Sequence, residues 1–195
     1  MPVVDDPLAL FESWLEEARA NLGYDADAMA VATATPGGTP SVRMVLLKGV
    51  DERGLVFFTN YSSRKGGELE ENPRAALLFH WAPLGRQVRV EGPVSRVDRT
   101  ESEAYARHRP RQSQLSALAS PQSRVVPSRE WLEKRVEELD RAHADVDVPV
   151  RADWGGYRVE PEAWEFWQHR DNRLHDRHRY ERGDGGGWRV DRLAP

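Results

Sequence analysis

The feature that most constrains the fold is a series of short apolar or alternating segments separated by turn residues. From position 29 the chain reads "MAVATAT", "PGGTP", "SVRMVLLKGV", "DERG" and "LVFFTN", which ends at position 60. Alternating β-branched and apolar residues between clusters of Gly, Pro, Asp and Thr are typical of β-strands joined by tight turns. This part of the chain therefore predicts an antiparallel meander.

The same pattern returns later in the chain. Further strands are predicted in "RAALLFHW" and "GRQVRVEGPVSRV", and the tail adds "WGGYRVEP", "AWEFWQ", "RHRYER" and "WRVDRLAP", the last two joined by a "GDGGG" turn. Strictly alternating β-α-β order is absent, which argues against a parallel doubly wound sheet. About seven strands joined mainly by tight turns favour a mainly β fold with added α-helices, built on a closed or nearly closed antiparallel barrel.

Helices are predicted before and between these strands. The first spans about residues 6–22, with Asp6 as N-cap, Pro7 at the first helical position and Gly23 as the stop. Ser62 or Ser63 can cap a short helix that ends before Pro73. The segment "RTESEAYARH" has a capping box of Thr100 with Glu103 and runs into a polar loop, "RPRQSQLSALASPQS". The third clear helix is "SREWLEKRVEELDRAH".

Length and composition limit the class of protein. A chain of 195 residues is most simply one domain, here 1–195, with the C-terminal strand region from about 154 to 195. The net charge of −4 argues against a general nucleic-acid binder, so any anion site must be local. No cysteine is present, which excludes disulfides, Cys-based zinc sites and thiol nucleophiles. Neither a membrane-length apolar run nor a secretory signal is found, so we expect no membrane association and a cytoplasmic location.

Two stretches in the first half could bind an anion. In "TNYSSRKG", residues 59–66, small hydroxyl residues precede a helix start and two adjacent cations, which suits a phosphate; a simple surface turn remains the alternative. In "RMVLLK", strand alternation places Arg43 and Lys48 on opposite faces, and a barrel strand with solvated ends is the competing interpretation. Lysine is informative here because, besides Lys134, only Lys48 and Lys65 are lysines.

Two stretches in the second half are also candidates. In "YARHRPRQSQ", Tyr105 and Arg109 are four residues apart, and Pro110 ends the helix so that Arg109, Arg111 and Ser113 gather near its exit; a charged helix end is the alternative. "QVRVEG" contributes Gln87. In "WQHRDNRLHDRHRYER", metal binding is disfavoured by ligand spacing and by the arginines, and nucleic-acid binding by the interspersed acids. Strand alternation would place Arg173, His175 and Arg177 on one face, where they would line a site for an electron-rich ligand.

Taken in order, nine motifs resemble those of the pyridoxine/pyridoxamine 5′-phosphate oxidase family. They are "RMVLLK", "FFTNYSSRKG", "NPRAALLFHW", "RQVRVEG", "RPRQSQ", "WGGYRV", "EFWQ", "RLHDR" and "RLAP", and they cover nearly the whole chain. The resemblance implies an FMN-binding split β-barrel homodimer with FMN at the subunit interface. It further implies oxidation of pyridoxamine or pyridoxine 5′-phosphate to pyridoxal 5′-phosphate, with O2 as electron acceptor and H2O2 as product.

The resemblance also implies residue roles. Those for FMN are Arg43, Met44, Val45, Leu46, Leu47, Lys48, Phe58, Thr59, Arg64, Lys65, Gln87, Gln122, Ser123, Trp167 and Arg177. Those for the substrate are Lys48, Tyr105, Arg109 and Ser113 around its phosphate, with Arg173 and His175 near its pyridine ring as the catalytic pair. No metal is implied. Surface charge is expected for His169, Arg170, His178, Arg179 and Arg182.

Alternative functions remain open at the level of sequence. One is the related split-barrel flavin oxidase of phenazine biosynthesis, and another is a non-catalytic FMN or pyridoxal-phosphate binding protein. A flavin reductase or deazaflavin-dependent enzyme is disfavoured by the "RLHDR" motif. Longer family members have an N-terminal arm that helps to close over the substrate, whereas this sequence starts almost at its first helix, so we expect lid closure to differ.

Overall fold

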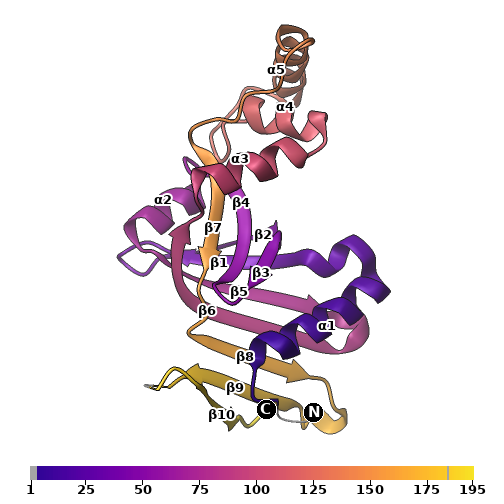
Figure 1. Cartoon of the computed structure of the whole chain (residues 1–195), viewed down its shortest axis with the longest axis vertical. Helices are drawn as coiled ribbons and strands as arrows, with labels where there is room; N and C mark the ends of the chain where they lie inside the picture. Colours follow the sequence, from indigo (N-terminus) through magenta and orange to yellow (C-terminus); the bar gives the residue numbers. More distant parts are fainter. Residues whose placement is uncertain (1–3, 184) are drawn as a thin grey trace.

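The computed structural model describes residues 4–183 and 185–195 of the chain. Its strands curl into an antiparallel half-barrel, with helices α3, α4 and α5 gathered at one end and the C-terminal strands at the other (Figure 1). Asp184, within the predicted "GDGGG" turn, lies outside the described residues. The mainly β fold with added helices that the sequence predicts is confirmed.

Ten strands are found in the described residues, more than the seven or so that the sequence predicts. They are β1 (Ala28–Ala34), β2 (Pro40–Leu46), β3 (Gly49–Asp51), β4 (Gly54–Asn60), β5 (Arg74–Trp81), β6 (Arg86–Arg96), β7 (Trp154–Val159), β8 (Ala163–Gln168), β9 (Asp176–Arg182) and β10 (Trp188–Arg192). Each predicted segment forms a strand, and the one at residues 41–50 is divided between β2 and the short β3.

Strand β6 divides the half-barrel into two parts. It pairs with β5 along most of its length, while its first half also pairs with β8 and its last residues with β7. One path of strands therefore runs β10-β9-β8-β6-β5-β1-β2, and β7, β4 and β3 branch from it. The branch occurs beside Gly92, where an added Cβ would lie 1.8 Å from the carbonyl oxygen of Glu160. Only glycine allows the two backbones to approach this closely.

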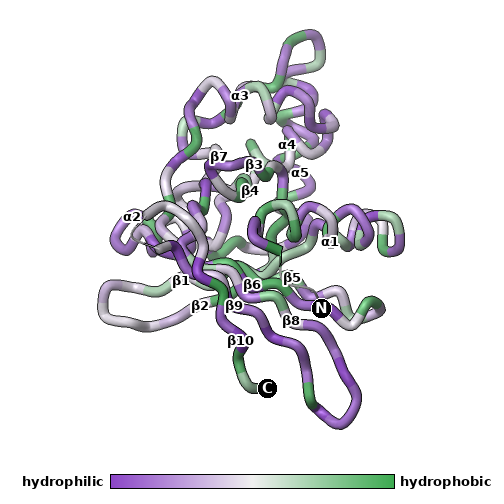
Figure 2. The backbone as a smooth tube through the Cα atoms, turned by 60° about the horizontal axis from the view of Figure 1, so that its bottom comes forward, coloured by the Kyte–Doolittle hydropathy of each residue, from purple (hydrophilic) through white to green (hydrophobic). Residues whose placement is uncertain are grey.

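The core lies between this sheet and helix α1 (Pro7–Leu22). Phe11 is fully buried, with ring centroids 5.0 Å from Phe79 and 5.3 Å from Trp164, and Trp14 meets Phe166 edge-on at 5.4 Å. Burial of rings of this size stabilises the fold by roughly 1.5–3 kcal/mol each. Figure 2 shows the hydrophobic stretches gathering in the central strands around β5 and β6.

The other helices are α2 (Arg64–Glu71), α3 (Arg99–His108), α4 (Arg111–Ala119) and α5 (Arg129–Ala142), and short 3-10 turns span Gly23–Asp27, Ala82–Leu84 and Asp171–Arg173. The caps at Asp6 and Ser63 are as predicted or within the predicted alternatives, and a third cap forms at Ser128. The Asp6 side chain accepts a hydrogen bond from the N–H of Leu8, Ser63 from that of Gly66, and Ser128 from that of Trp131. Each cap satisfies a backbone donor that the helix leaves free.

Two local predictions between residues 98 and 119 are wrong. The capping box does not form: α3 starts at Arg99 with Asp98, two residues before Thr100, at the N-cap position, and Glu103 pairs with Arg99 at 2.7 Å, one turn apart. The predicted polar loop after Pro110 contains helix α4. Its sequence is mostly polar, but Leu115 and Ala119, four residues apart, are both buried. These two residues lie on one face of α4 and pack against the protein. With only two buried residues, the apolar periodicity of the segment is too weak to indicate a helix.

The ends of two predicted strands also differ. Strand β2 stops at Leu46, so Lys48 lies beyond it, where its backbone N–H donates to the carbonyl of Val56 at 2.8 Å. Strand β9 begins at Asp176, and Arg173 has a left-handed backbone with φ of 62°. The alternation predicted through residue 173 is therefore wrong, because this segment is a 3-10 turn and loop. The single-domain interpretation stays a prediction.

Candidate functional site

A cavity of about 520 Å³ opens between the ends of β2 and β4 on one side and helices α3 and α4 on the other. Its lining comprises Met44, Val45, Leu46, Lys48, Phe58, Thr59, Asn60, Lys65, Tyr105, Arg109, Gln112, Ser113, Ser116, Ala117, Ser120, Gln122 and Trp154. Three of these side chains are cations, and none of the described lining residues is a carboxylate. A cavity of this composition favours an anionic ligand.

Lys65 forms one buried corner of the cavity. Only 6% of the residue is exposed, and its Nζ donates to Thr59 Oγ1 at 2.8 Å, Gln122 Oε1 at 3.1 Å and Ser63 Oγ at 3.3 Å. Burial, followed by the charge of Arg43, lowers the pKa of Lys65 to about 8. The ammonium group thus has neutral acceptors and no direct carboxylate partner among the described residues, so an anion entering the cavity would find its charge available.

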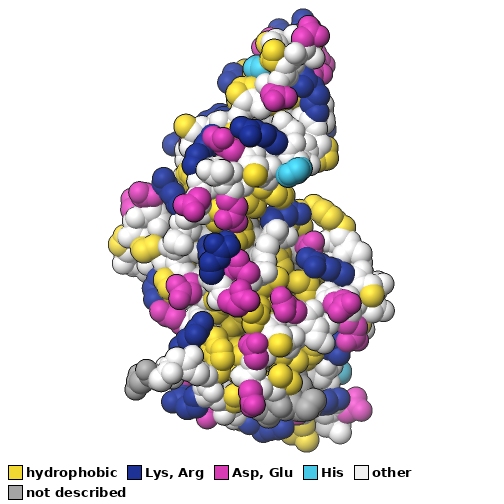
Figure 3. All heavy atoms as spheres, viewed as in Figure 1, with side chains coloured by type: hydrophobic (Ala, Val, Ile, Leu, Met, Phe, Trp, Pro, Cys, Tyr) yellow, Lys and Arg dark blue, Asp and Glu magenta, His cyan; other side chains and the backbone are white. Residues whose placement is uncertain are grey.

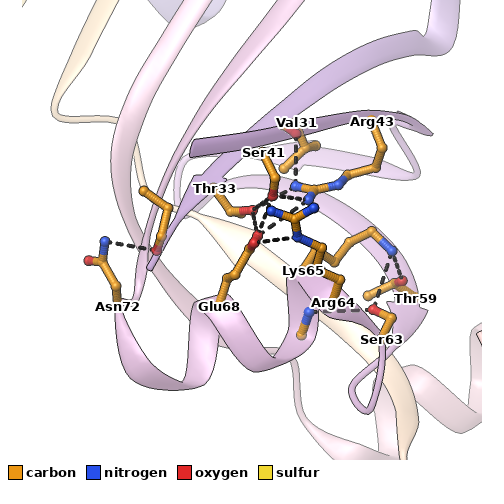
Figure 4. A network of polar contacts seen from close by, with 12 residues as sticks. Val31, Thr33, Ser41, Arg43, Thr59, Ser63, Arg64, Lys65, Glu68 and Asn72 are labelled. Carbon is orange, nitrogen blue, oxygen red and sulfur yellow. Dashed lines mark hydrogen bonds and ion pairs between the residues drawn. The ribbon is translucent and has the colours of Figure 1, made fainter. Parts of the chain in front are cut away.

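Behind Lys65, Arg43 and Arg64 converge on the carboxylate of Glu68 (Figure 4). Arg64 Nε donates to Glu68 Oε1 at 2.9 Å, and Arg43 Nη2 lies 3.3 Å from Oε2. Glu68 is 6% exposed. The three residues Arg43, Arg64 and Lys65 are called the phosphate corner below, because they supply the bidentate and point-charge donors that a phosphate needs.

The lining also contains three stacked aromatic rings. Phe58 and Tyr105 lie nearly parallel with centroids 4.0 Å apart, and Phe58 and Trp154 are 5.5 Å apart. The guanidinium carbon of Arg109 lies 5.2 Å from the Trp154 ring centroid. Burial raises the pKa of Tyr105 and lowers that of Arg109. An arginine still keeps its charge, so a cation is held against an aromatic wall.

The turn between α3 and α4 explains how Arg109 and Ser113 reach the same cavity. Helix α3 ends at His108, Arg109 is extended, and Pro110 allows α4 to start at once. Ser113 then lies in the first turn of α4, its N–H donating to the carbonyl of Pro110 at 2.8 Å. The sequence predicts that Arg109, Arg111 and Ser113 gather at the helix exit. Arg109 and Ser113 do line the same cavity, but Arg111 lies outside its described lining and donates to Asp140 instead.

A second group of predicted residues lies elsewhere, on the sheet. Gln87, Trp167 and Arg177 are register partners across β6, β8 and β9 and are called the sheet row below. Arg177 Nε donates to Glu165 Oε1 at 2.8 Å, and the His175 ring centroid lies 4.6 Å from that of Trp167. Neither the sheet row nor Glu165 and His175 beside it belong to the described lining of the cavity.

Most of the predicted site residues lie in one of two places, the cavity or the sheet row. Those in the cavity lining are Met44, Val45, Leu46, Lys48, Phe58, Thr59, Lys65, Tyr105, Arg109, Ser113 and Gln122. Arg43 and Arg64 lie behind it on Glu68, and Leu47 is in the core at 1% exposure. Ser123 is an exposed residue with φ of 67°, outside the lining. Gln87, Trp167 and Arg177 form the sheet row, with His175 packed against Trp167 and Arg173 in the preceding 3-10 turn.

Sequence reasoning missed several residues of the site. Asn60, Gln112, Ser116 and Trp154 line the cavity, and Glu68 holds the phosphate corner. For Glu68 a signal was present, since it follows Arg64 by four residues on a predicted helix, the spacing of an ion pair. The lining by Asn60, Gln112, Ser116 and Trp154 depends on packing between distant elements and has no comparable local signal.

Other classes of site find no support in the described residues. They contain no group of three or more His, Cys, Asp or Glu side chains placed to hold a metal ion, and no helix among them is long and apolar enough to span a membrane. Basic and acidic side chains are interspersed on the face shown in Figure 3. The prediction that His178 is surface charge is wrong: the residue is 1% exposed, and burial lowers its pKa.

Fold and site together define an antiparallel split-barrel protein whose cavity suits an anionic, ring-containing ligand. Residues 15–142 match the family described as "Pyridoxamine 5'-phosphate oxidase", and residues 154–195 match "Pyridoxine 5'-phosphate oxidase C-terminal dimerisation region". The chain belongs to the pyridoxamine 5′-phosphate oxidase family.

Relatives of known name and structure agree with this membership. Pyridoxine/pyridoxamine 5′-phosphate oxidase of Gluconobacter oxydans is 54% identical over 100% of this chain and 98% of its own length. The enzyme of the same name from Rubrobacter xylanophilus is 58% identical over 97% of this chain and 87% of its own. The crystal structure of PhzG from Burkholderia lata 383 in complex with tetrahydrophenazine-1-carboxylic acid has a TM-score of 0.92 and 34% identity, covering 98% and 94% of the two chains.

Proposed function

We propose that the chain is an FMN-dependent oxidase that converts pyridoxamine or pyridoxine 5′-phosphate to pyridoxal 5′-phosphate, with O2 as electron acceptor and H2O2 as product. The observation that carries the proposal is the cavity, whose described lining contains Lys48, Lys65 and Arg109 and the rings of Phe58, Tyr105 and Trp154 but no carboxylate. Two phosphorylated ring compounds need several cations and flat apolar surfaces. Family membership and the full-length relatives support the same activity.

The residues around Lys65 fit the phosphate of FMN. Lys65 offers a buried ammonium group, and Arg43 and Arg64 lie next to it. The edge formed by Met44, Val45 and Leu46 offers backbone and apolar contacts for a flavin ring. When bound, FMN would accept a hydride from C4′ of the substrate and pass the electrons to O2. The protein groups bind and orient; they need no covalent role.

For the substrate phosphate we propose Lys48, Tyr105, Arg109 and Ser113. All four line the cavity, and Arg109 is fixed by its contact with Trp154. A fixed guanidinium binds a phosphate with less loss of side-chain entropy than a free one. This group explains why the reaction would require a phosphorylated substrate.

Arg173 and His175 are proposed as the groups at the substrate ring. In this structure the backbone N–H of Arg170 donates to His175 Nδ1 at 3.1 Å. When His175 is neutral, this bond requires the tautomer that carries its hydrogen on Nε2, so that Nε2 can donate to a ligand. His175 would then act as a hydrogen-bond donor, with Arg173 covering the ring and assisting at C4′.

Because the sheet row and these two residues lie outside the cavity lining of their own chain, we propose a homodimer with FMN at the interface. A second copy would present its sheet row, Arg173 and His175 to the cavity. The match of residues 154–195 to a dimerisation region supports this arrangement. The cytoplasmic location expected from the sequence stays a prediction.

A second candidate is the oxidation of a tricyclic carboxylated substrate, favoured by the likeness to the PhzG structure. Lys48, Arg109 and Ser113 in one cavity argue for a phosphate instead.

The deciding experiment is anaerobic reduction of the FMN-loaded protein. Pyridoxine 5′-phosphate should bleach the flavin absorbance, and unphosphorylated pyridoxine should do so poorly because it cannot engage the cations. Equal rates with the two compounds would remove the proposed phosphate site, and a protein that FMN cannot reconstitute would refute the proposed function.

A further inference from the structure

Glu68 is the one carboxylate in the polar network of Figure 4, and both of its oxygens are occupied. Oε1 accepts from Arg64 Nε at 2.9 Å, while Oε2 accepts from the hydroxyls of Thr33 and Ser41 and from Arg43 Nη2. The donors come from β1, β2 and α2. Glu68 therefore ties two strands to the helix that carries Lys65.

The same contacts fix the orientation of Arg43. Its Nη1 donates to Thr33 Oγ1 at 2.6 Å and to the carbonyl of Val31 at 3.1 Å, and its Nη2 donates to Ser41 Oγ. The Arg43 side chain is 21% exposed, whereas that of Arg64 is 61% exposed. Without a partner on Glu68, a solvent-exposed side chain such as that of Arg64 would sample many rotamers.

We propose that Glu68 is a positioning residue of the phosphate corner: its carboxylate holds Arg43 and Arg64 beside Lys65 and offsets one of their positive charges. This inference rests on the proposed FMN site. Glu68 is absent from the cavity lining and acts through the two arginines. It is thus distinct from the groups assigned to direct ligand contact.

The charge balance of the corner supports this role. Burial alone would raise the pKa of Glu68, but hydrogen bonds from Ser41, Thr33 and Arg64 and the charge of Arg43 outweigh it and lower the pKa to about 2. The carboxylate is therefore ionised near neutral pH.

The charge of Glu68 affects the pKa of Lys65. Burial and Arg43 lower its pKa, and Glu68 opposes them. The other titratable or charged groups of the cavity are Lys48 after β2, and Tyr105 and Arg109 at α3. Loss of the Glu68 charge would leave Arg43 uncompensated and lower the pKa of Lys65 further, so that more of it is neutral near pH 7.

Glu68→Gln tests the inference because an amide has only one acceptor oxygen. Its NH2 group would face either Arg64 or the donors now on Oε2, so at least one of these contacts is lost. The matched control is Glu71→Gln, the same change at an exposed position of the same helix. The apo-proteins are titrated with FMN and with riboflavin by flavin fluorescence, from about pH 6 to about pH 9.

Glu68→Gln should weaken FMN binding by about tenfold or more near neutral pH, and riboflavin binding should stay unchanged. The loss of FMN affinity on raising the pH should begin at a lower pH than in the wild type. Ser41→Ala, which removes one donor to the carboxylate, should give a smaller loss in the same direction, and it provides the test if Glu68→Gln does not fold.

An FMN affinity and pH profile equal to those of Glu71→Gln would overturn the inference. Equal losses of FMN and riboflavin would also overturn it, because they indicate a general structural role. If the wild-type protein itself does not bind FMN, the proposed function fails; if it binds and Glu68→Gln is unaltered, only the role of Glu68 fails.

Discussion

The cavity and the sheet row differ in how they are built. The cavity draws its residues from strands β2, β4 and β7 and from helices α2 to α4 and the segments next to them, so it depends on tertiary packing. The sheet row follows from register alone, because Gln87, Trp167 and Arg177 are register partners on three adjacent strands. One region encloses a cavity within a single chain, and the other is a surface that we propose completes the site of a second copy.

The cavity and the sheet row also differ in the charged groups beside their cations. In the cavity, Lys48, Lys65 and Arg109 have no carboxylate beside them in the described lining. In the sheet row, Arg177 pairs with Glu165, which is only 3% exposed. A cation that is already neutralised by a buried carboxylate contributes less to phosphate binding and is better suited to orienting a ring. The cavity is thus suited to binding a charged group, and the sheet row to orienting a ring.

The largest effect should come from Arg173→Ala. If this side chain covers the substrate ring, its loss should slow anaerobic flavin reduction by roughly a hundredfold, because misplacement at the reacting centre is costly. FMN affinity should change far less, because the phosphate corner is untouched. Stopped-flow reduction and a flavin titration measure the two effects separately. A normal reduction rate would remove the role assigned to Arg173.

The next prediction tests whether the two regions act across chains. Lys65→Met and Arg173→Ala should each be nearly inactive as homodimers. If the cavity of one chain works with the sheet row and Arg173 of the other, a mixed dimer of the two variants contains one intact site. Random mixing after reversible dissociation should then restore about a quarter of wild-type activity. A mixture that forms mixed dimers but stays inactive would show that both regions act within one chain.

The smallest effect concerns the pH dependence of Lys65. Its pKa of about 8 means that the apo-protein loses this charge as the pH rises through that value, so FMN affinity should fall by up to about tenfold per pH unit above it. Protein stability should respond in the opposite direction: the unfolded chain holds this proton up to about 10.5, so raising the pH between these values favours the folded apo-form. Lys65→Arg should give a flatter binding profile, and an unchanged one would contradict the assignment.

Much of the fold could be predicted because its signals are local. The N-cap at Asp6, the turn chemistry after residue 35 and the alternating tail strands each depend on a few neighbouring residues. The helix at Arg111–Ala119 and the end of β2 could not be predicted, since both depend on packing with distant segments. Periodicity is informative only where one face is clearly apolar.

For the site, the residues alone indicate the candidates for anion binding: two rare lysines, an Arg-Lys pair after hydroxyl residues, and Arg109 next to a helix-ending proline. Motif order also determined the family. Folding was needed to show that Lys48, Lys65 and Arg109 line one cavity, that Arg109 contacts Trp154, and that Glu68 pairs with Arg43 and Arg64. The physical reason is that residue chemistry is a local property, whereas the charge balance of a site depends on segments that meet only on folding.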